Sequence, residues 1–350
     1  MKIRMVDIVF FTVISVIVGI VVFRNDAQDA HVDVVPMDES GDESGMGGEI
    51  IVDTHPLAIE YMRQQDYPGS DIVIEQILSP GANYDRYIVS YISEGLTQFA
   101  LLTVPRGTSP DGGWPAIVFN HGYISPDIYR TTERYIAYTD ALSRNGYVVL
   151  KPDYRGHGNS EGEAKGGYGS PAYTIDVLNG LSSLKKYPGV NPDNIGMWGH
   201  SMGGAITLRS MVIVPDVKAG VIWAGVVGSY EDLFTRWRRS GQYANRPSPR
   251  PNSWRSQFIE QYGEPSEGNV FWDEISATSY LSDISGPVQL HHATGDQSVP
   301  YEFSQTLHDR MQKAEKLSEL YIYQGDDHNI NQNFSTAMGR TVAFFDMYLK

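Results

Sequence analysis

The stretch 194–204 constrains this chain more than any other, because it joins a short apolar run to a helical pattern through the residues Gly-His-Ser-Met-Gly. Ser201 stands at the centre, with Gly199 and Gly203 two residues to either side. A serine at the apex of a sharp strand-to-helix turn has a strained backbone, so its neighbours must be very small. The pattern predicts a nucleophile elbow, in which the following helix aims free N–H groups at developing negative charge. The alternative is a chance Gly/Ser turn, since the pattern by itself is short.

The composition is that of one large globular domain with additional segments. A chain of 350 residues with 41% hydrophobic content is long enough to bury a sizeable core, and its length does not require two domains. There is no cysteine, which excludes disulfides, zinc–thiolate sites and a cysteine nucleophile. The stability of the fold must therefore come from packing.

A membrane-targeting segment opens the sequence. Residues 8–23 carry no charge, and Lys2 and Arg4 precede them. This run is longer than a usual secretory signal core and shorter than the roughly 20 residues that span a bilayer comfortably. We predict that residues 1–24 are an uncleaved anchor whose N-terminus stays in the cytoplasm, so that the rest of the chain lies on the extracytoplasmic side. Secretion after signal cleavage is the alternative.

An acidic segment with several glycines follows the predicted anchor. Residues 25–60 include ten Asp or Glu and no Lys or Arg. This composition is typical of a solvated spacer, and we predict a disordered tether over 25–56 ahead of a folded domain over 57–350. No basic patch suited to nucleic acid occurs elsewhere in the chain, so we expect no nucleic-acid partner.

From residue 57 the pattern becomes that of an α/β domain. Alternating segments at 71–78, 87–92 and 98–104 predict an antiparallel lead-in. Strand and helix patterns then alternate, which indicates a mainly parallel sheet covered by helices on both faces. The predicted strands are 116–120, 147–150, 219–226, 288–293 and 320–323, and the predicted helices are 132–144, 173–187, 301–313 and 336–349.

A candidate acid and a candidate base follow two of the later strands. Asp296 comes after the strand 288–293, and His328 comes after the strand 320–323. Catalytic groups gather at the carboxyl ends of the strands in this architecture, and the order serine, acid, histidine is the one that a nucleophile elbow requires. We predict that Asp296 orients His328, which takes the Ser201 proton and later returns it to the leaving group. Asp326 and Asp327 are rivals for the acid role, but adjacency on one loop does not aim a carboxylate at the ring.

The oxyanion formed during acyl transfer needs two backbone donors. One is the N–H of Met202, directly after the nucleophile, and the other comes from the loop after the strand 116–120, which by position is the N–H of Tyr123. We interpret the nearby His121 as structural. Adjacent His291 and His292 point to opposite faces of a strand, so they cannot share one metal ion, and we expect no metal and no cofactor.

Five motifs occur in order along the chain and together resemble a known family. They are His121-Gly122-Tyr123, the stretch 153–160, the elbow 199–204, Gly295-Asp296 with Val299-Pro300, and Asp327-His328. From about residue 84 to the C-terminus the sequence resembles the catalytic domain of the prolyl oligopeptidase family of serine peptidases, within the α/β-hydrolases. The resemblance implies an α/β-hydrolase fold with Ser201, Asp296 and His328 as the triad and the N–H groups of Tyr123 and Met202 as oxyanion donors. It also implies a structural loop over 155–160 beside the site.

The same resemblance leaves two substrate classes open. Peptidases of the family carry an N-terminal β-propeller that filters substrates, whereas only about 60 residues separate the predicted tether from the first core strands here. Smaller relatives without a propeller include esterases that act on carboxylic esters. We therefore predict a serine-type peptidase working through an acyl-enzyme, with a carboxylesterase for small esters as the alternative and a non-catalytic surface binding module as a further one. The expected partners are a short peptide or small ester and the membrane, and the oligomeric state stays open.

An insertion rich in Trp, Arg and Pro separates the strand 219–226 from the strand 288–293. We predict that about 231–280 form a cap over the active site. No Asp or Glu occurs between Arg236 and Arg255, so the cap would present a positive face to a substrate carboxylate or another anion. The alternative is that these arginines pair with nearby acids such as Asp232. The candidate substrate-binding residues are Arg236, Trp237, Arg238 and Arg239.

Overall fold

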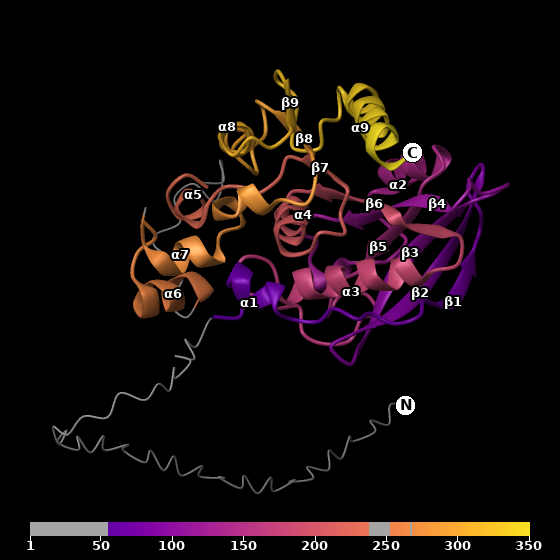
Figure 1. The fold of residues 1–350 in the computed structure, drawn as a ribbon, viewed down its shortest axis with the longest axis horizontal. Coiled ribbons are helices and arrows are strands. Elements are labelled where there is room, and N and C mark those ends of the chain that lie inside the picture. Colours follow the sequence, from indigo (N-terminus) through magenta and orange to yellow (C-terminus); the bar gives the residue numbers. More distant parts are fainter. Residues whose placement is uncertain (1–54, 238–252, 267) are drawn as a thin grey trace, which may run out of the picture. The chain divides into compact units, whose positions relative to one another are not determined.

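A single mixed sheet forms the centre of the protein in a computed structural model, which describes residues 55–237, 253–266 and 268–350. In these residues the sheet has nine strands in the order β1-β2-β3-β5-β4-β6-β7-β8-β9 (Figure 1). The predicted anchor and all but the end of the predicted tether lie outside the described residues. The strands are β1 (Val73–Leu78), β2 (Tyr84–Ser93), β3 (Leu96–Pro105), β4 (Trp114–Asn120), β5 (Val148–Pro152), β6 (Val190–His200), β7 (Ala219–Trp223), β8 (Val288–Ala293) and β9 (Ser318–Tyr323).

The type of strand pairing changes once across this sheet, from antiparallel to parallel. β1, β2 and β3 pair antiparallel with one another, and β3 also pairs antiparallel with β5. From β5 through β4, β6, β7 and β8 to β9, every pairing is parallel. The predicted antiparallel lead-in and the predicted mainly parallel sheet are both confirmed.

Helices cover both faces of the sheet. The central strands are apolar on both faces, because successive residues point to opposite sides and both sets are apolar. In β4, Ala116 and Val118 belong to one buried apolar cluster, whereas Ile117 and Phe119 belong to another. The first cluster includes residues of α3, α4 and α8, and the second includes residues of α2 and α9, which lie across the sheet from α3 and α4 in Figure 1. These helices are α2 (Ile136–Arg144), α3 (Ala172–Lys186), α4 (Met202–Ile213), α8 (Glu302–Lys313) and α9 (Phe334–Leu349).

Two predicted boundaries are wrong by several residues, and in both places the backbone is left-handed. The helix predicted over 132–144 begins only at Ile136, since Tyr135 has φ 52° and cannot continue a right-handed helix. The strand predicted over 219–226 ends at Trp223, because Ala224 has φ 47°. Both turns lie at the carboxyl side of the sheet, where the chain must change direction around the candidate site.

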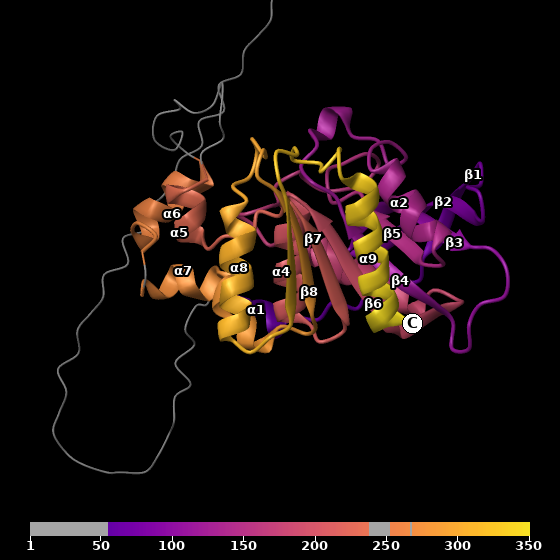
Figure 2. The ribbon, with the colours of Figure 1, turned by 90° about the horizontal axis from the view of Figure 1, so that it is seen from above.

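The insertion between β7 and β8 is helical where the structure describes it. It contains α5 (Tyr230–Thr235), α6 (Trp254–Tyr262) and α7 (Val270–Ile275), followed by the short 3-10 helices Ala277–Ser279 and Leu281–Asp283. Tyr230, Phe258 and Trp272 pack together in a separate apolar cluster that also buries Leu57. Figures 1 and 2 both show α5, α6 and α7 gathered at one end of the sheet.

The described chain begins with a packed segment. The ring of His55 lies edge-on to Phe258 and Phe271 of the insertion, and its Nδ1 accepts a hydrogen bond from the N–H of Leu57. The short helix α1 (Ile59–Arg63), which was not predicted from the sequence, follows at once. Within the described ranges, no helix has both the length and the apolar character needed to cross a membrane.

Candidate active site

Ser201 lies at a strained turn between β6 and α4. Its φ of 55° and ψ of −118° fall outside the regions that serine ordinarily adopts. A Cβ on Gly199 would lie 2.3 Å from the carbonyl oxygen of Gly203, and a Cβ on Gly203 would lie 1.9 Å from the carbonyl oxygen of Asn120. Glycine is therefore required on both sides of the serine, as the elbow pattern indicates.

Two backbone segments meet in front of this turn. Met202 is the first residue of α4, so helix geometry leaves its N–H without an intrahelical acceptor. On the loop after β4, a Cβ on Gly122 would lie 3.2 Å from the Cβ of Ser201, which shows how closely that loop approaches the elbow. Tyr123, the second expected oxyanion donor, follows directly, and its side chain is exposed. The arrangement brings the two predicted donor segments to the same place.

The structure brings His328 and Asp296 together. The Nδ1–H of His328 donates to Oδ2 of Asp296 at 2.7 Å, which leaves Nε2 of the ring as the basic nitrogen. The other carboxylate oxygen of Asp296 accepts from the N–H groups of Ser298 and Val299. No hydrogen bond joins Ser201 to His328 in this part of the described chain, and such catalytic contacts often tighten only when substrate binds.

A second histidine, His292, also contacts this carboxylate, a role that its place in the sequence does not indicate. Nε2 of His292 lies 3.1 Å from Oδ2 of Asp296 and 3.2 Å from the carbonyl oxygen of Val299, so this nitrogen carries the proton. Its Nδ1 then accepts from the hydroxyl of Ser304. Burial raises the pKa of Asp296, but the hydrogen bonds from His292 and His328 outweigh it and hold the pKa well below its usual value. Asp296 is thus a fixed negative charge at the Nδ1 edge of the His328 ring.

The two rival carboxylates hold the loop and do not contact the ring of His328. Asp326 accepts hydrogen bonds from the N–H groups of Gln332 and Asn333, at the start of α9. Asp327 accepts from the N–H groups of Asn329 and Asn331. These contacts shape the turn that presents His328, and they leave Asp296 as the carboxylate in contact with its ring.

A chain of hydrogen bonds links the loop after β4 to the loop that carries His328. The N–H of Gly122 donates to the hydroxyl oxygen of Tyr135 at 2.9 Å, and that hydroxyl lies 2.8 Å from Nδ1 of His200. Nε2 of His200 lies 2.9 Å from the carbonyl oxygen of His328. Since a carbonyl only accepts, His200 donates from Nε2 and accepts from Tyr135 at Nδ1. Burial lowers the pKa of His200 to about 3, so the ring is neutral and keeps this tautomer.

The tyrosine–histidine connection was not found in the sequence. His200 lies inside the elbow motif, but nothing local shows that its ring faces Tyr135, 65 residues earlier. The pairing becomes visible only once β4 and β6 lie side by side.

His121 has the structural role that was predicted for it. Its ring is buried and stacks between Tyr129 and Tyr154, with centroid distances of 4.9 and 4.2 Å. Burial lowers the pKa of His121 to about 3. Below it, Tyr129 and Thr131 donate hydrogen bonds to the buried carboxylate of Asp153. These contacts fix the loop that precedes Tyr135.

The predicted structural loop over 155–160 is tied to the fold by an ion pair. Arg155 donates from Nε and Nη2 to the buried carboxylate of Asp176 on α3, and Nη2 also contacts Glu94. The hydroxyl of Ser160 accepts from the N–H of Phe99 on β3. The loop is therefore fastened to both α3 and the antiparallel strands.

The candidate substrate-binding residues of the cap do not form one group in the described part of the chain. Arg236 pairs with Asp232 at 2.8 Å, as the pairing alternative expected. The indole N–H of Trp237 donates to the carbonyl oxygen of Ser298, next to Asp296, which brings this residue to the side of the site. Arg238 and Arg239 lie outside the described residues.

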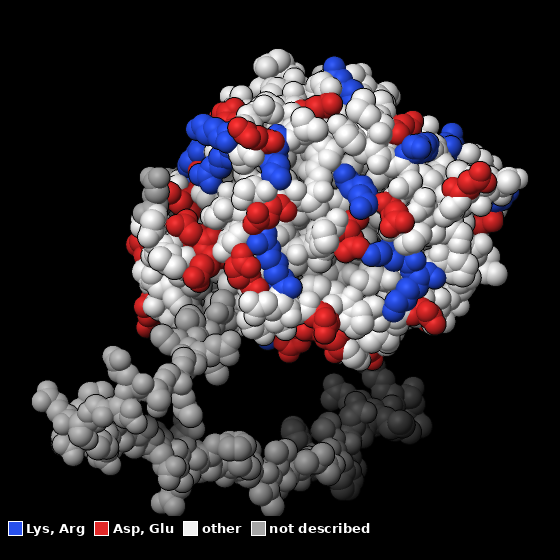
Figure 3. Space-filling view, in the orientation of Figure 1, with Lys and Arg blue, Asp and Glu red and all other residues white. Residues whose placement is uncertain are grey.

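The adjacent histidines of β8 face opposite sides, as expected. His291 contacts Gln289 and Tyr323, whereas His292 contacts Asp296 and Ser304. On the face shown in Figure 3, basic and acidic side chains are interspersed and no continuous basic region is visible.

A strained serine between a strand and a helix, with a histidine–aspartate pair after two later parallel strands, defines the α/β-hydrolase class. Residues 134–350 match the prolyl oligopeptidase family, which covers more than half of the chain. The chain therefore belongs to the prolyl oligopeptidase family and is a serine hydrolase.

Relatives described as peptidases match this chain at low identity. The protein described as uncharacterized peptidase YtmA of Bacillus subtilis is 24% identical over 256 residues, which is 70% of this chain and 86% of that protein. A probable dipeptidyl peptidase 4 of Aspergillus flavus is 26% identical over 274 residues, or 74% of this chain and 32% of the relative. The chain thus spans about a third of the fungal relative's length.

This chain shares its fold with solved structures of a peptidase and of an esterase. The acylaminoacyl peptidase of Pyrococcus horikoshii matches with a TM-score of 0.61 at 21% identity. The matched region is 77% of this chain and 42% of the peptidase chain. The acetyl xylan esterase of Paenibacillus sp. R4 also has a TM-score of 0.61, at 17% identity, and covers 83% of this chain and 92% of its own. These likenesses confirm the predicted α/β-hydrolase fold.

Proposed function

We propose that the protein is a serine peptidase that works through an acyl-enzyme on Ser201. The hydrogen bond from His328 Nδ1 to Asp296 carries this proposal, because it leaves Nε2 of the ring free to take the proton of the serine hydroxyl. The negative charge of Asp296 stabilises the imidazolium that results. The two N–H donors of Met202 and Tyr123 stabilise the oxyanion.

The proposed reaction has two halves that use the same groups. Ser201 Oγ forms a bond to the substrate carbonyl carbon while its proton passes to Nε2 of His328. The tetrahedral intermediate then breaks its bond to the leaving amine or alcohol, which takes the proton from His328. Water attacks the acyl-enzyme in the same way, so that an acid leaves and Ser201 regains its proton.

Two observations bear on the choice of substrate. Family membership and the match to most of the Bacillus subtilis peptidase favour peptides. The match to nearly the whole length of an acetyl xylan esterase favours the alternative, a carboxylesterase built as a single domain. Amide cleavage is the more demanding reaction, because His328 must protonate a poor leaving group.

Two experiments test the proposal in sequence. Labelling by a fluorophosphonate should occur in the wild type and be lost in Ser201→Ala, whereas absence of labelling in a folded wild type would favour the non-catalytic binding module. A panel of short peptide amides and matched alkyl esters then separates the two enzymes. Cleavage of amides that is lost in Ser201→Ala supports the peptidase, and turnover of esters alone moves the assignment to carboxylesterase.

We also propose that the anchor predicted over 1–24 holds this hydrolase on the extracytoplasmic side of a membrane. The uncharged run 8–23 and the preceding Lys2 and Arg4 support the proposal. Fractionation of cells that express the full chain, with protease added to intact cells or spheroplasts, tests it. Activity in the membrane fraction that is accessible to the protease is the expected result, and activity in the culture medium would favour a cleaved signal.

A further inference from the structure

The loop that carries Asp296 is folded around the carboxylate of that residue. Oδ1 of Asp296 accepts hydrogen bonds from the N–H of Ser298 at 2.7 Å and from the N–H of Val299 at 3.0 Å. Oδ2, the other oxygen, accepts from Nδ1 of His328. The direction in which the carboxylate faces His328 therefore depends on the peptide groups of Ser298 and Val299.

One of these peptide groups is also bound from outside the loop. The carbonyl of Ser298 and the N–H of Val299 belong to the same planar peptide group. Its carbonyl oxygen accepts a hydrogen bond from the indole N–H of Trp237 at 2.8 Å, and its N–H donates to Asp296. Hydrogen bonds in such a chain polarise one another, and the rigid peptide plane fixes their relative directions. Trp237 is thus connected through a single peptide group to the carboxylate that contacts His328.

Trp237 belongs to the insertion between β7 and β8 and lies just after α5. Its backbone N–H donates to the carbonyl oxygen of Asp232 on α5. The guanidinium carbon of Arg255 on α6 lies 5.7 Å from the centre of the Trp237 ring, which is within the range of a cation–π contact. Two helices of the insertion therefore contact this residue, and the position of the indole depends on theirs.

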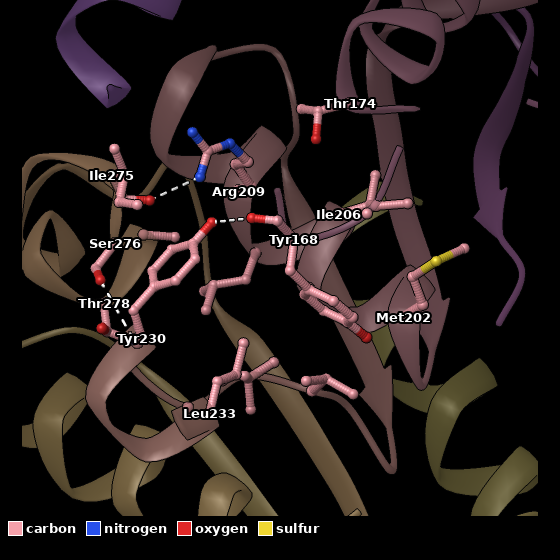
Figure 4. A pocket seen from close by; sticks show the side chains of 17 residues that line it. Tyr168, Thr174, Met202, Ile206, Arg209, Tyr230, Leu233, Ile275, Ser276 and Thr278 are labelled. Atoms are coloured by element: carbon pink, nitrogen blue, oxygen red, sulfur yellow. Dashed lines mark hydrogen bonds between the residues drawn. The ribbon is translucent and has the colours of Figure 1, made fainter. Parts of the chain in front are cut away.

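The indole also packs against the segment on the other side of the elbow. The ring of Tyr168 lies edge-on to Trp237, with a centroid distance of 5.1 Å and an interplanar angle of 81°. A Cβ on the neighbouring Gly167 would lie 3.6 Å from the sulfur of Met202, the residue that carries one proposed oxyanion donor. Figure 4 shows Tyr168 between Tyr230 and Met202, with its carbonyl oxygen bonded to the Tyr230 hydroxyl. The ring of Trp237 is thus held from two directions.

We propose that Trp237 is a positioning residue for the catalytic acid. It acts on Asp296 through the peptide group between Ser298 and Val299, and in this way it makes the alignment of His328 depend on the insertion. The sequence places Trp237 among the candidate substrate-binding residues, and the proposal gives its N–H a different role. The inference rests on the proposed acyl transfer at Ser201 and adds a residue that this reaction needs.

Trp237→Phe tests this role, because it removes the indole N–H and keeps an aromatic ring beside Tyr168. We expect kcat for 4-nitrophenyl acetate to fall about 5-fold with KM changed less than about 2-fold, since the acid is less well aligned and this ester makes few demands on the pocket. The same factor should be found with 4-nitrophenyl hexanoate. A factor that varies with the length of the acyl group, or a loss confined to KM, would mean that Trp237 binds substrate and would overturn the proposal.

Trp272→Phe is the matched control. The indole N–H of Trp272 also donates to a backbone carbonyl oxygen, that of Gly263 at 3.1 Å, but this hydrogen bond lies within the insertion. The control should keep kcat within about 2-fold of the wild type when both variants are assayed well below their thermal unfolding midpoints. An equal loss of kcat in the two variants would indicate a general loosening of the insertion and would contradict the link to Asp296.

A double-mutant cycle tests the route through the carboxylate. In Asp296→Ala, the further change Trp237→Phe should lower kcat by less than about 2-fold, because the group through which Trp237 acts is already absent. Losses that multiply would show that Trp237 acts by another route. If Trp237→Phe does not fold, incorporation of 3-benzothienylalanine at position 237 takes its place, since sulfur then replaces the N–H in a ring of the same shape.

The hydrogen bond between His328 and Asp296 provides a measurement that needs no turnover. A short hydrogen bond to a carboxylate shifts the Nδ1–H proton of His328 to low field in the proton NMR spectrum, and His328→Gln identifies the resonance by its loss. We expect this resonance to move in Trp237→Phe and to stay within its linewidth in Trp272→Phe.

The two measurements separate this proposal from the proposed function. If the resonance moves as expected but the wild type hydrolyses neither ester, the acyl-transfer proposal fails and the coupling of Trp237 to Asp296 stands. If the wild type hydrolyses both esters and Trp237→Phe behaves like Trp272→Phe, the function stands and the coupling is wrong.

Discussion

At the scale of single residues, the site depends on which carboxylate faces His328. Asp296 contacts the ring and Asp327 holds the turn around it, although both lie near His328 in space or in sequence. A side chain's distance along the chain therefore says little about its part in catalysis. The distinction can be measured directly.

Asp296→Asn should lower kcat on an activated ester by about 10³-fold or more, because an amide cannot stabilise the imidazolium and favours the wrong tautomer of His328. Asp327→Asn should cost far less, since its carboxylate only accepts backbone and asparagine hydrogen bonds. Steady-state kinetics with 4-nitrophenyl acetate, with circular dichroism as a check of folding, gives both numbers. The opposite order would reassign the acid.

Ser201→Ala should reduce turnover to below about 1% of the wild type and leave the fold intact, because triad members act as a unit and a small surface group is removed without a cavity. His328→Ala should fall by a similar factor, and the double variant should be no worse than either single one. Additive losses in the double variant would show that the two side chains act in separate steps.

At the scale of elements, two loops are coupled by Tyr135 and His200. The chain of hydrogen bonds runs from the N–H of Gly122 through both side chains to the carbonyl oxygen of His328. It joins the loop of Tyr123, the proposed oxyanion donor, to the loop of His328, the proposed base. Because misplacement of reacting groups by a fraction of an ångström slows catalysis, we interpret Tyr135 and His200 as positioning residues.

Tyr135→Phe should lower kcat about 10-fold with KM changed less than about 2-fold, since the substrate pocket is untouched and only the alignment of donor and base is relaxed. The pH profile should keep its shape, because His200 is neutral throughout and does not titrate with the base. His200→Gln, whose amide can still donate towards the carbonyl of His328, should retain more activity than His200→Ala. A loss confined to KM, or equal activity of the two His200 variants, contradicts the positioning role.

A buried histidine of β8 predicts how stability depends on pH. Burial lowers the pKa of His291 to about 3, whereas an unfolded histidine has a pKa of about 6.5. Between these values the unfolded chain binds one more proton than the folded chain, so stability is lost as the pH falls from about 6.5 towards 3, at about 1.4 kcal/mol per pH unit. His121 and His200, with pKa values lowered to about 3, act in the same direction.

Urea unfolding of wild type and His291→Gln at pH 7, 6 and 5 measures this contribution. The glutamine can keep hydrogen bonds to Gln289 and Tyr323. The free energy of unfolding of His291→Gln should depend less steeply on pH than that of the wild type, by about 1.4 kcal/mol per pH unit, which corresponds to one proton. Parallel slopes for the two proteins would mean that His291 is protonated in the folded state.

The elements that could be predicted from the sequence are those whose signal is local. The elbow, the apolar strands β4 and β8 and the order of Ser201, Asp296 and His328 follow from short patterns and their succession. The left-handed turns at Tyr135 and Ala224 carry no such pattern, since both residues usually avoid this conformation. The partners of Arg209 depend on segments that meet only after folding, as Leu57 and Arg209 are 152 residues apart.

At the scale of the whole molecule, the first residues that the structure describes include a partner of Arg209. The carbonyl of Leu57 accepts from this buried guanidinium, and the side chain of Leu57 is buried in the cluster of the insertion. His55 packs against aromatic rings of the same insertion. The last residues of the predicted tether and those that follow it therefore pack with the described domain, and they connect α4 to the helices of the insertion.

Two truncations, one that ends before this contact and one that ends after it, show which residues act as a tether and which stabilise the domain. Removal of residues 1–50 should give an active enzyme in the soluble fraction with an unchanged unfolding midpoint, because His55 and Leu57 are retained. Removal of residues 1–58 deletes the buried side chain of Leu57 and an acceptor of Arg209, which should cost about 3 kcal/mol or more and lower the midpoint by several degrees. Thermal unfolding and ester hydrolysis of both proteins are the measurements. If removal of residues 1–50 already lowers the unfolding midpoint, the tether docks on the domain. If removal of residues 1–58 has no effect, the Leu57–Arg209 contact does not hold the insertion in place.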